Sequence, residues 1–161
     1  MQQLPVEQAL ARLGRLERAT GLLGADGSAP CGLHALVEAA IAPFRAGDNF
    51  FVEGPACELP RDACVPLCLA LHELCTNASK YGALSAPGGR VALLWTVGEG
   101  EGRLLRMVWR ECGGPPVAPP ARTGMGTQLL RRQRGLGRVE VAFHPDGVEC
   151  TIGIEGVECE G

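Results

Sequence analysis

The residues best suited to chemistry lie together in one short segment, 73–81. The chain has a single lysine, Lys80, a single tyrosine, Tyr81, and two asparagines, of which Asn77 lies three residues before the lysine. Glu73 precedes Asn77 by four residues, so on a helix Glu73, Asn77 and Lys80 share one face. An ordinary solvent-exposed helix face has the same spacing, so this pattern alone does not distinguish a functional site from a solvated surface.

A carboxylate, a carboxamide and an ammonium together suit a magnesium ion bound to a polyphosphate. Mg²⁺ takes oxygen ligands in an octahedron, keeps several waters and shares phosphate oxygens. Asn77 offers one carbonyl oxygen, Glu73 can hold a metal-bound water, and Lys80 can neutralise phosphate charge. The segment therefore predicts a site for a metal–phosphate ligand.

Two later segments offer groups that could complete such a site. Glycines in the run 124–127 (Gly-Met-Gly-Thr) precede a predicted helix, where backbone N–H groups and the helix N-terminus favour an anion. At the end of a predicted strand, Glu111 is followed by glycines and can accept a hydrogen bond from an exocyclic amine such as adenine N6. Each signal is weak when taken alone, because GxG turns and acidic strand ends are common.

Helices followed by antiparallel strands are expected to position these groups. Amphipathic spacing and end signals predict helices over 6–23, 32–44, 61–81 and 128–134. Apolar or β-branched runs predict strands over 50–53, 58–60, 90–97, 103–110, 138–143 and 148–154, the last four as two hairpins. The stretch 113–123 is a long Gly/Pro-rich loop. This order indicates an α+β fold, a two-layer sandwich of helices on a sheet.

Composition excludes several classes of protein. The 161 residues suffice for about one domain, and a net charge of −3 gives no basic footprint for nucleic acid. No secretory signal follows Met1 and no apolar run is long enough to span a bilayer, so we expect a soluble cytoplasmic chain. The eight cysteines contain no CxxC pair. Cys64, Cys68 and Cys75 share a helical stripe, and core thiols are favoured there over a metal cluster.

In this order and spacing, three segments resemble the boxes of the HWE-type histidine kinases. Residues 71–85 resemble the N box, 109–117 the G1 box and 124–127 the G2 box. The family name records the N-box histidine and the Trp-x-Glu of the G1 box, here His72, Trp109 and Glu111. The likeness extends over about residues 31–154, and the N-box match is highly specific.

The resemblance implies a Bergerat-type (GHKL) ATP-binding domain over 31–161, preceded by a helix and loop, 1–30, that could be the remnant of a dimerisation region. It implies ATP and Mg²⁺ as cofactors. Asn77 is then the magnesium ligand, with Glu73 and Lys80 beside it, and Glu111 stands at the adenine-reading position. The residues of the three boxes that complete the implied nucleotide site are Tyr81, Gly113, Gly124, Met125, Gly126 and Thr127. Of these, Gly124 and Gly126 would belong to a lid over the phosphates.

One departure from the family concerns the phosphoacceptor histidine. The chain has three histidines, His34, His72 and His144, and none lies in a typical phosphoacceptor sequence. The resemblance thus implies phosphoryl transfer to a histidine not on this chain, with a response regulator as a further partner; the oligomeric state stays open. Two alternatives remain: a non-enzymatic interaction module of the same fold, and an anti-sigma-type serine kinase, which Trp109-x-Glu111 disfavours.

Overall fold

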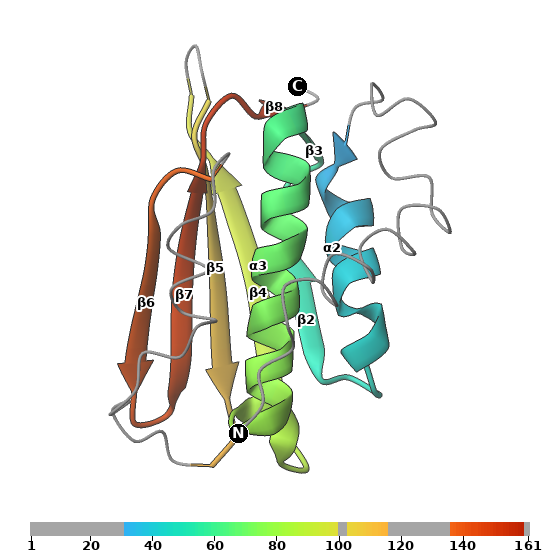
Figure 1. Ribbon diagram of the computed structural model, residues 1–161, viewed down its shortest axis with the longest axis vertical. Helices are drawn as coiled ribbons and strands as arrows, with labels where there is room; N and C mark the ends of the chain where they lie inside the picture. Colours follow the sequence, from blue (N-terminus) through green and yellow to red (C-terminus); the bar gives the residue numbers. More distant parts are fainter. Residues whose placement is uncertain (1–30, 100–102, 116–135, 160–161) are drawn as a thin grey trace.

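The computed structural model describes residues 31–99, 103–115 and 136–159, which form two helices against a five-stranded sheet and a smaller three-stranded sheet (Figure 1). The predicted helices 6–23 and 128–134, the N-terminal segment 1–30 and the glycine run 124–127 lie outside the described residues. Their predictions are not tested by the structure.

The longest helix, α3 (Arg61–Lys80), confirms the helix predicted over 61–81. Pro66 lies in the second turn, where its missing N–H removes the helix hydrogen bond to the carbonyl of Asp62. Asp62 in the first turn and Lys80 in the last turn both complement the helix dipole. Cys64, Cys68 and Cys75 are at most 4% exposed, which confirms that these thiols belong to the core. Within the ranges given above, no group of three His, Cys, Asp or Glu side chains could hold a metal ion.

Helix α2 (Leu33–Ile41) and the 3₁₀ turn η1 (Ala42–Phe44) occupy the second predicted helix, 32–44. Pro43 falls in the 3₁₀ turn, which accounts for the change from α to tighter winding there. The buried side chains of α2 face the core beside α3. Among the described helices, none is both long and apolar enough to cross a membrane.

The main sheet has the strand order β2-β4-β5-β7-β6. Strands β2 and β4 are parallel and the other neighbours are antiparallel, so the sheet is mixed. Its strands are β2 (Phe50–Glu53), β4 (Arg90–Val97), β5 (Leu105–Cys112), β6 (Val139–His144) and β7 (Gly147–Ile154). All five predicted strand positions of this sheet are confirmed, with shifts of one or two residues at the ends.

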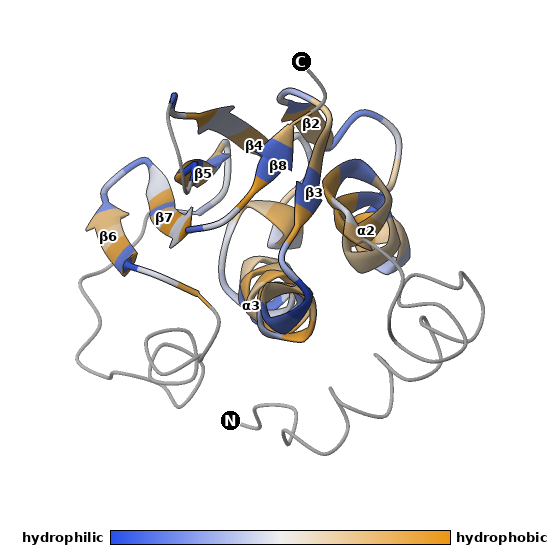
Figure 2. Ribbon diagram, turned by 90° about the horizontal axis from the view of Figure 1, so that it is seen from above, coloured by the Kyte–Doolittle hydropathy of each residue, from blue (hydrophilic) through white to orange (hydrophobic). Residues whose placement is uncertain are grey.

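Alternating side chains of β4, β5 and β7 build the core under the helices. Inward-facing residues such as Leu93, Met107, Trp109 and Ile152 are fully buried, whereas their neighbours along each strand are more exposed. Seen from above, α2 and α3 lie on the same side of the sheet (Figure 2). The architecture is therefore the expected two-layer α/β sandwich.

The smaller sheet has the order β1-β3-β8 and lies at the N-terminal end of α3 (Figure 1). Strand β3 (Cys57–Leu59) confirms the strand predicted over 58–60. Strands β1 (Cys31–Gly32) and β8 (Glu158–Cys159) were not predicted, because two residues cannot display a periodic pattern.

Candidate functional site

The last turns of α3 carry the three polar residues singled out in the sequence, ordered from buried to exposed. Glu73 is 4% exposed, Asn77 is half-buried, and Lys80 is exposed. The Lys80 charge acts on the Glu73 carboxyl, so the two groups are neighbours in space. A carboxyl, an amide and an ammonium thus follow one another toward the C-terminal end of the helix, which lies at the bottom of Figure 1.

Burial changes the acid strength of Glu73. Removal from water raises the pKa of this carboxyl above its ordinary value of 4.5, and the Lys80 ammonium opposes part of that shift. A cation that approached the carboxyl would favour its ionised form in the same way as Lys80. A metal ion near Glu73 would therefore favour its ionised carboxylate, which can accept a hydrogen bond from a metal-bound water. The Asn77 amide oxygen can bind a metal without losing a proton.

The Glu111 carboxylate lies directly beyond the end of α3, inside β5. It is 5% exposed and accepts two hydrogen bonds, one to each oxygen. The backbone N–H of Ala83 donates to Oε1 at 3.0 Å, and the indole N–H of Trp109 donates to Oε2 at 3.0 Å. Burial raises the pKa of Glu111, and these two hydrogen bonds oppose that shift. Through the hydrogen bond from Ala83, Glu111 connects the segment that follows α3 to strand β5 of the main sheet.

Glycines allow this close approach of chain segments. A Cβ built on Gly82 would lie 2.1 Å from Glu111 Oε1, so any side chain there would displace the carboxylate. Gly113 has φ +76°, a left-handed conformation that favours glycine, and its backbone turns the chain sharply after β5. The N-box and G1-box segments therefore meet at glycine positions, with Glu111 between them.

The remaining predicted site residues divide into two groups. Tyr81 is 48% exposed directly after α3, and Gly113 follows β5, so both lie at the same end of the molecule as Asn77. Gly124, Met125, Gly126 and Thr127 lie outside the described residues, so their part in the nucleotide site stays a prediction.

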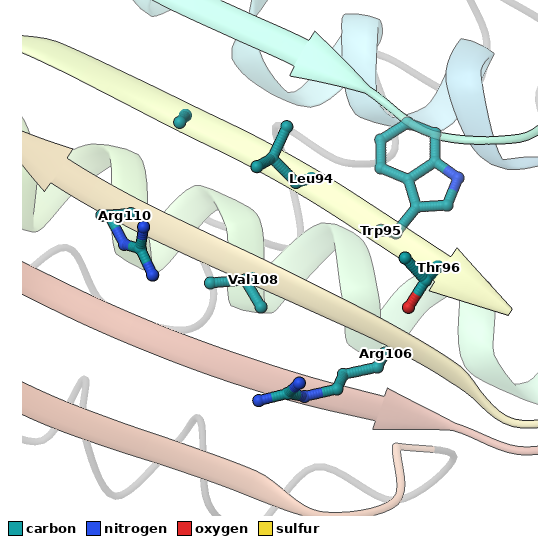
Figure 3. Close-up of a pocket in the computed structure, with 7 residues that line it drawn as sticks. Leu94, Trp95, Thr96, Arg106, Val108 and Arg110 are labelled. Carbon is teal, nitrogen blue, oxygen red and sulfur yellow. The ribbon is translucent and has the colours of Figure 1, made fainter. Parts of the chain in front are cut away.

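A separate hollow of about 170 Å³ lies on the opposite face of the sheet (Figure 3). Strands β4 and β5 supply its lining residues Ala92, Leu94, Trp95, Thr96, Arg106, Val108 and Arg110. Figure 3 shows the side chains of Leu94, Val108 and Arg106 in front of the strands, with α3 behind them. Of the predicted site residues that the structure describes, none lines this hollow, so it is distinct from the row of Glu73, Asn77 and Lys80.

Sequence reasoning missed the role of Trp109 as a hydrogen-bond donor to Glu111. The Trp-x-Glu spacing does place both side chains on one face of a strand, and this signal was present in the sequence. The Ala83 N–H carried no signal, because any residue except proline supplies that donor.

Comparison with known proteins identifies histidine kinases that are similar in sequence to this chain. The blue-light-activated histidine kinase of Brucella anthropi is 36% identical over 147 residues, which make up 88% of this chain and 30% of that protein. The protein of the same name from Brucella abortus is 36% identical over 122 residues, 74% of this chain and 25% of that protein. The chain belongs to the histidine kinase family. It spans at most 30% of the length of these relatives. No protein-family model matches it.

Solved histidine kinase structures share the fold. The histidine kinase domain of the blue-light activated kinase EL346 from Erythrobacter litoralis superposes with a TM-score of 0.65 at 20% identity, covering 94% of this chain and 75% of that chain. The mycobacterial sensor histidine kinase MprB gives a TM-score of 0.58 at 18% identity, covering 82% of this chain and 99% of that chain. At these identities the likeness establishes the fold alone, which is that of the family's kinase domains.

Proposed function

We propose that this chain is the ATP-binding catalytic domain of a histidine kinase and that it binds Mg²⁺–ATP beside the C-terminal half of α3. The observation that carries the proposal is the row of Glu73, Asn77 and Lys80, graded from buried to exposed, next to the buried Glu111. Membership of the histidine kinase family supports the same conclusion.

The donor set fits a magnesium ion shared with phosphates. Asn77 would supply one ligand oxygen, and phosphate oxygens and waters would supply the rest, as Mg²⁺ prefers. This arrangement needs no cluster of protein carboxylates. Glu73 would hold a metal-bound water, and Lys80 would place positive charge on the phosphates. When bound, the metal supplies charge neutralisation of the γ-phosphoryl group.

Glu111 keeps capacity for a further hydrogen bond. An ionised carboxylate has about four acceptor positions, and Ala83 and Trp109 occupy two of them. The adenine N6 amine of ATP is the donor we propose for another. The two existing hydrogen bonds would hold the carboxylate in a fixed orientation for that contact, with Tyr81, Gly113 and the glycine run 124–127 around the nucleotide.

Phosphoryl transfer would go to a histidine outside the three in this chain. The His34 ring packs on Trp95 with a centroid distance of 4.7 Å, His72 lies half-buried within α3, and His144 is exposed at the end of β6. We propose a phosphoacceptor domain and a response regulator as partners, and the cytoplasm as the place of reaction. The imidazole nitrogen of the acceptor would take the γ-phosphoryl group, and ADP would leave.

The nucleotide site is tested by calorimetric titration of the chain with ATP, once in the presence of Mg²⁺ and once in the presence of a chelator that removes it. The intact chain should bind ATP more tightly with Mg²⁺, and Asn77→Ala should abolish that difference. Lys80→Ala should weaken binding roughly 10–100-fold, the loss of a charged contact of about 1.5–3 kcal/mol. Arg106→Ala is the matched control, because it removes an exposed cation from the opposite sheet face. Unchanged Mg²⁺ dependence in Asn77→Ala would refute the assignment.

A transfer assay separates this function from the alternatives. The chain is mixed with labelled ATP and a separate acceptor domain, and the label on the acceptor is tested for acid stability. Acid-labile label identifies phosphohistidine and supports the proposal. Acid-stable label would instead indicate a serine kinase, and absence of ATP binding would indicate an interaction module.

A further inference from the structure

Cys57 and Cys159 lie opposite each other in the small sheet although 102 residues separate them in sequence. Strands β3 and β8 are antiparallel with Cys57 and Cys159 as direct partners, and the two Sγ atoms are 2.9 Å apart. Both are free thiols in this structure. Two sulfurs brought this close need little backbone movement to become bonded.

The pairing of β8 with β3 is otherwise weak. It consists of two residue pairs, and the second sets Glu58 against Glu158. Like charges directly opposite one another destabilise a strand pair. The thiol pair is therefore the favourable cross-strand contact between these two strands, and a covalent link at this position would have a large effect on how firmly β8 is held.

The two thiols differ in access to solvent. Cys57 is 5% exposed, and burial together with the contact with Cys159 raises its pKa to about 12, even though the Arg103 guanidinium acts in the opposite direction. Cys159 is half-buried and more accessible. An oxidant in solution would therefore meet Cys159 first, with Cys57 in position to resolve the oxidised product.

We propose that Cys57 and Cys159 are a reversible modification site, which forms a disulfide when the protein meets a peroxide. In the first step the Cys159 thiol reacts with hydrogen peroxide to give a sulfenic acid and one water. In the second step the Cys57 sulfur attacks the Cys159 sulfur, the S–S bond forms and a second water leaves. Two thiols are oxidised and one peroxide is reduced to two waters, and a dithiol reductant reverses the change.

The location of the pair predicts its consequence. The bond would close a loop of about 100 residues and thereby restrict the unfolded chain, which stabilises the folded state. The pair lies at the N-terminal end of α3, whereas Asn77 and Lys80 lie toward the other end of this 20-residue helix, roughly 30 Å long. Oxidation should consequently stabilise the domain and leave its affinity for nucleotide unchanged.

The test oxidises the full chain with hydrogen peroxide, then counts thiols and maps peptides by mass spectrometry after alkylation under denaturing conditions. Two of the eight thiols should be lost, with Cys57 and Cys159 in one linked peptide pair. The melting temperature should rise by roughly 10 °C and return after dithiothreitol treatment. Cys57→Ser and Cys159→Ser should each abolish both effects. Cys112→Ser, which removes an exposed thiol outside the pair, should abolish neither.

Three results would overturn the proposal. The first is that all eight thiols remain after peroxide treatment, or that the only disulfide formed joins two copies of the chain through Cys112. The second is an intramolecular disulfide between other cysteines, such as the buried neighbours Cys31 and Cys64. The third is a linked pair that leaves the melting temperature unchanged. Because the serine variants are compared with each other and with Cys112→Ser, a folding defect in one of them does not decide the result.

Discussion

Replacement of Gly82 by alanine is the sharpest test of how the end of α3 is joined to the sheet. The backbone of Gly82 has φ −111°, which alanine adopts without strain, so the substitution perturbs packing alone. The added Cβ would lie 2.1 Å from Glu111 Oε1 and 3.0 Å from Ala78 Cα. The carboxylate must then move, and its hydrogen bond from the Ala83 N–H is lost.

The expected cost follows from two contributions. Loss of a hydrogen bond to a charged group costs about 1.5–3 kcal/mol, and forcing a methyl group into a packed region costs about 1–3 kcal/mol. We therefore expect Gly82→Ala to lower the free energy of unfolding by roughly 3–5 kcal/mol, measured by urea unfolding. Gly32→Ala is the matched control, because a Cβ there meets nothing within 4 Å and φ is −68°. Its effect should stay below about 1 kcal/mol.

A double-mutant cycle identifies the cause. If the Glu111 carboxylate is what the new methyl group displaces, Gly82→Ala should cost much less in a Glu111→Ala background than in the intact chain. The reasoning would be refuted by equal costs in both backgrounds. It would also be refuted if Gly82→Ala were as stable as the Gly32→Ala control.

Two further predictions concern the buried acids. Trp109→Phe removes the indole donor to Glu111 and should lower the free energy of unfolding by roughly 2–4 kcal/mol in urea titrations, with unchanged stability counting against the hydrogen bond. Glu73 has a pKa raised by burial, so its contribution to stability is fully present below its ordinary pKa of 4.5 and is lost as pH rises through the higher folded value. The unfolding free energy of the intact chain should therefore fall relative to Glu73→Gln as pH rises above 4.5. A constant difference between the two proteins would contradict the raised pKa.

The sequence predicted the fold well where elements are long and periodic. Helix α3 and strand β4 were placed almost to the residue, because a 20-residue amphipathic helix and an eight-residue alternating strand carry strong local signals. Strand β5 was placed two residues early, since Leu104 continues the apolar run before Leu105 and conceals where the strand begins. Its true end includes Glu111 and Cys112, because these residues pair with Val91 and Arg90 of β4.

The sequence predicted less about contacts between distant segments. The row of Glu73, Asn77 and Lys80 followed from helical spacing, but its gradient of burial depends on what packs against each turn. The opposition of Cys57 and Cys159 had no local signal, because it depends on a two-residue strand paired across 102 positions. Such pairings depend on how the whole chain packs around its core, so they can be identified only from the three-dimensional structure.

The energetics of the two buried carboxyls explain why they mark a site. Burial raises the pKa of Glu73 and of Glu111, so each ionised group is less favourable inside the protein than in water. Acids whose pKa is raised by burial and that lie at one end of a fold are candidates for a functional site, because a bound cation or amine favours the ionised carboxylate and offsets part of the cost of desolvation. A magnesium–nucleotide brings both kinds of partner at once, and its binding should stabilise the folded chain through these same two residues.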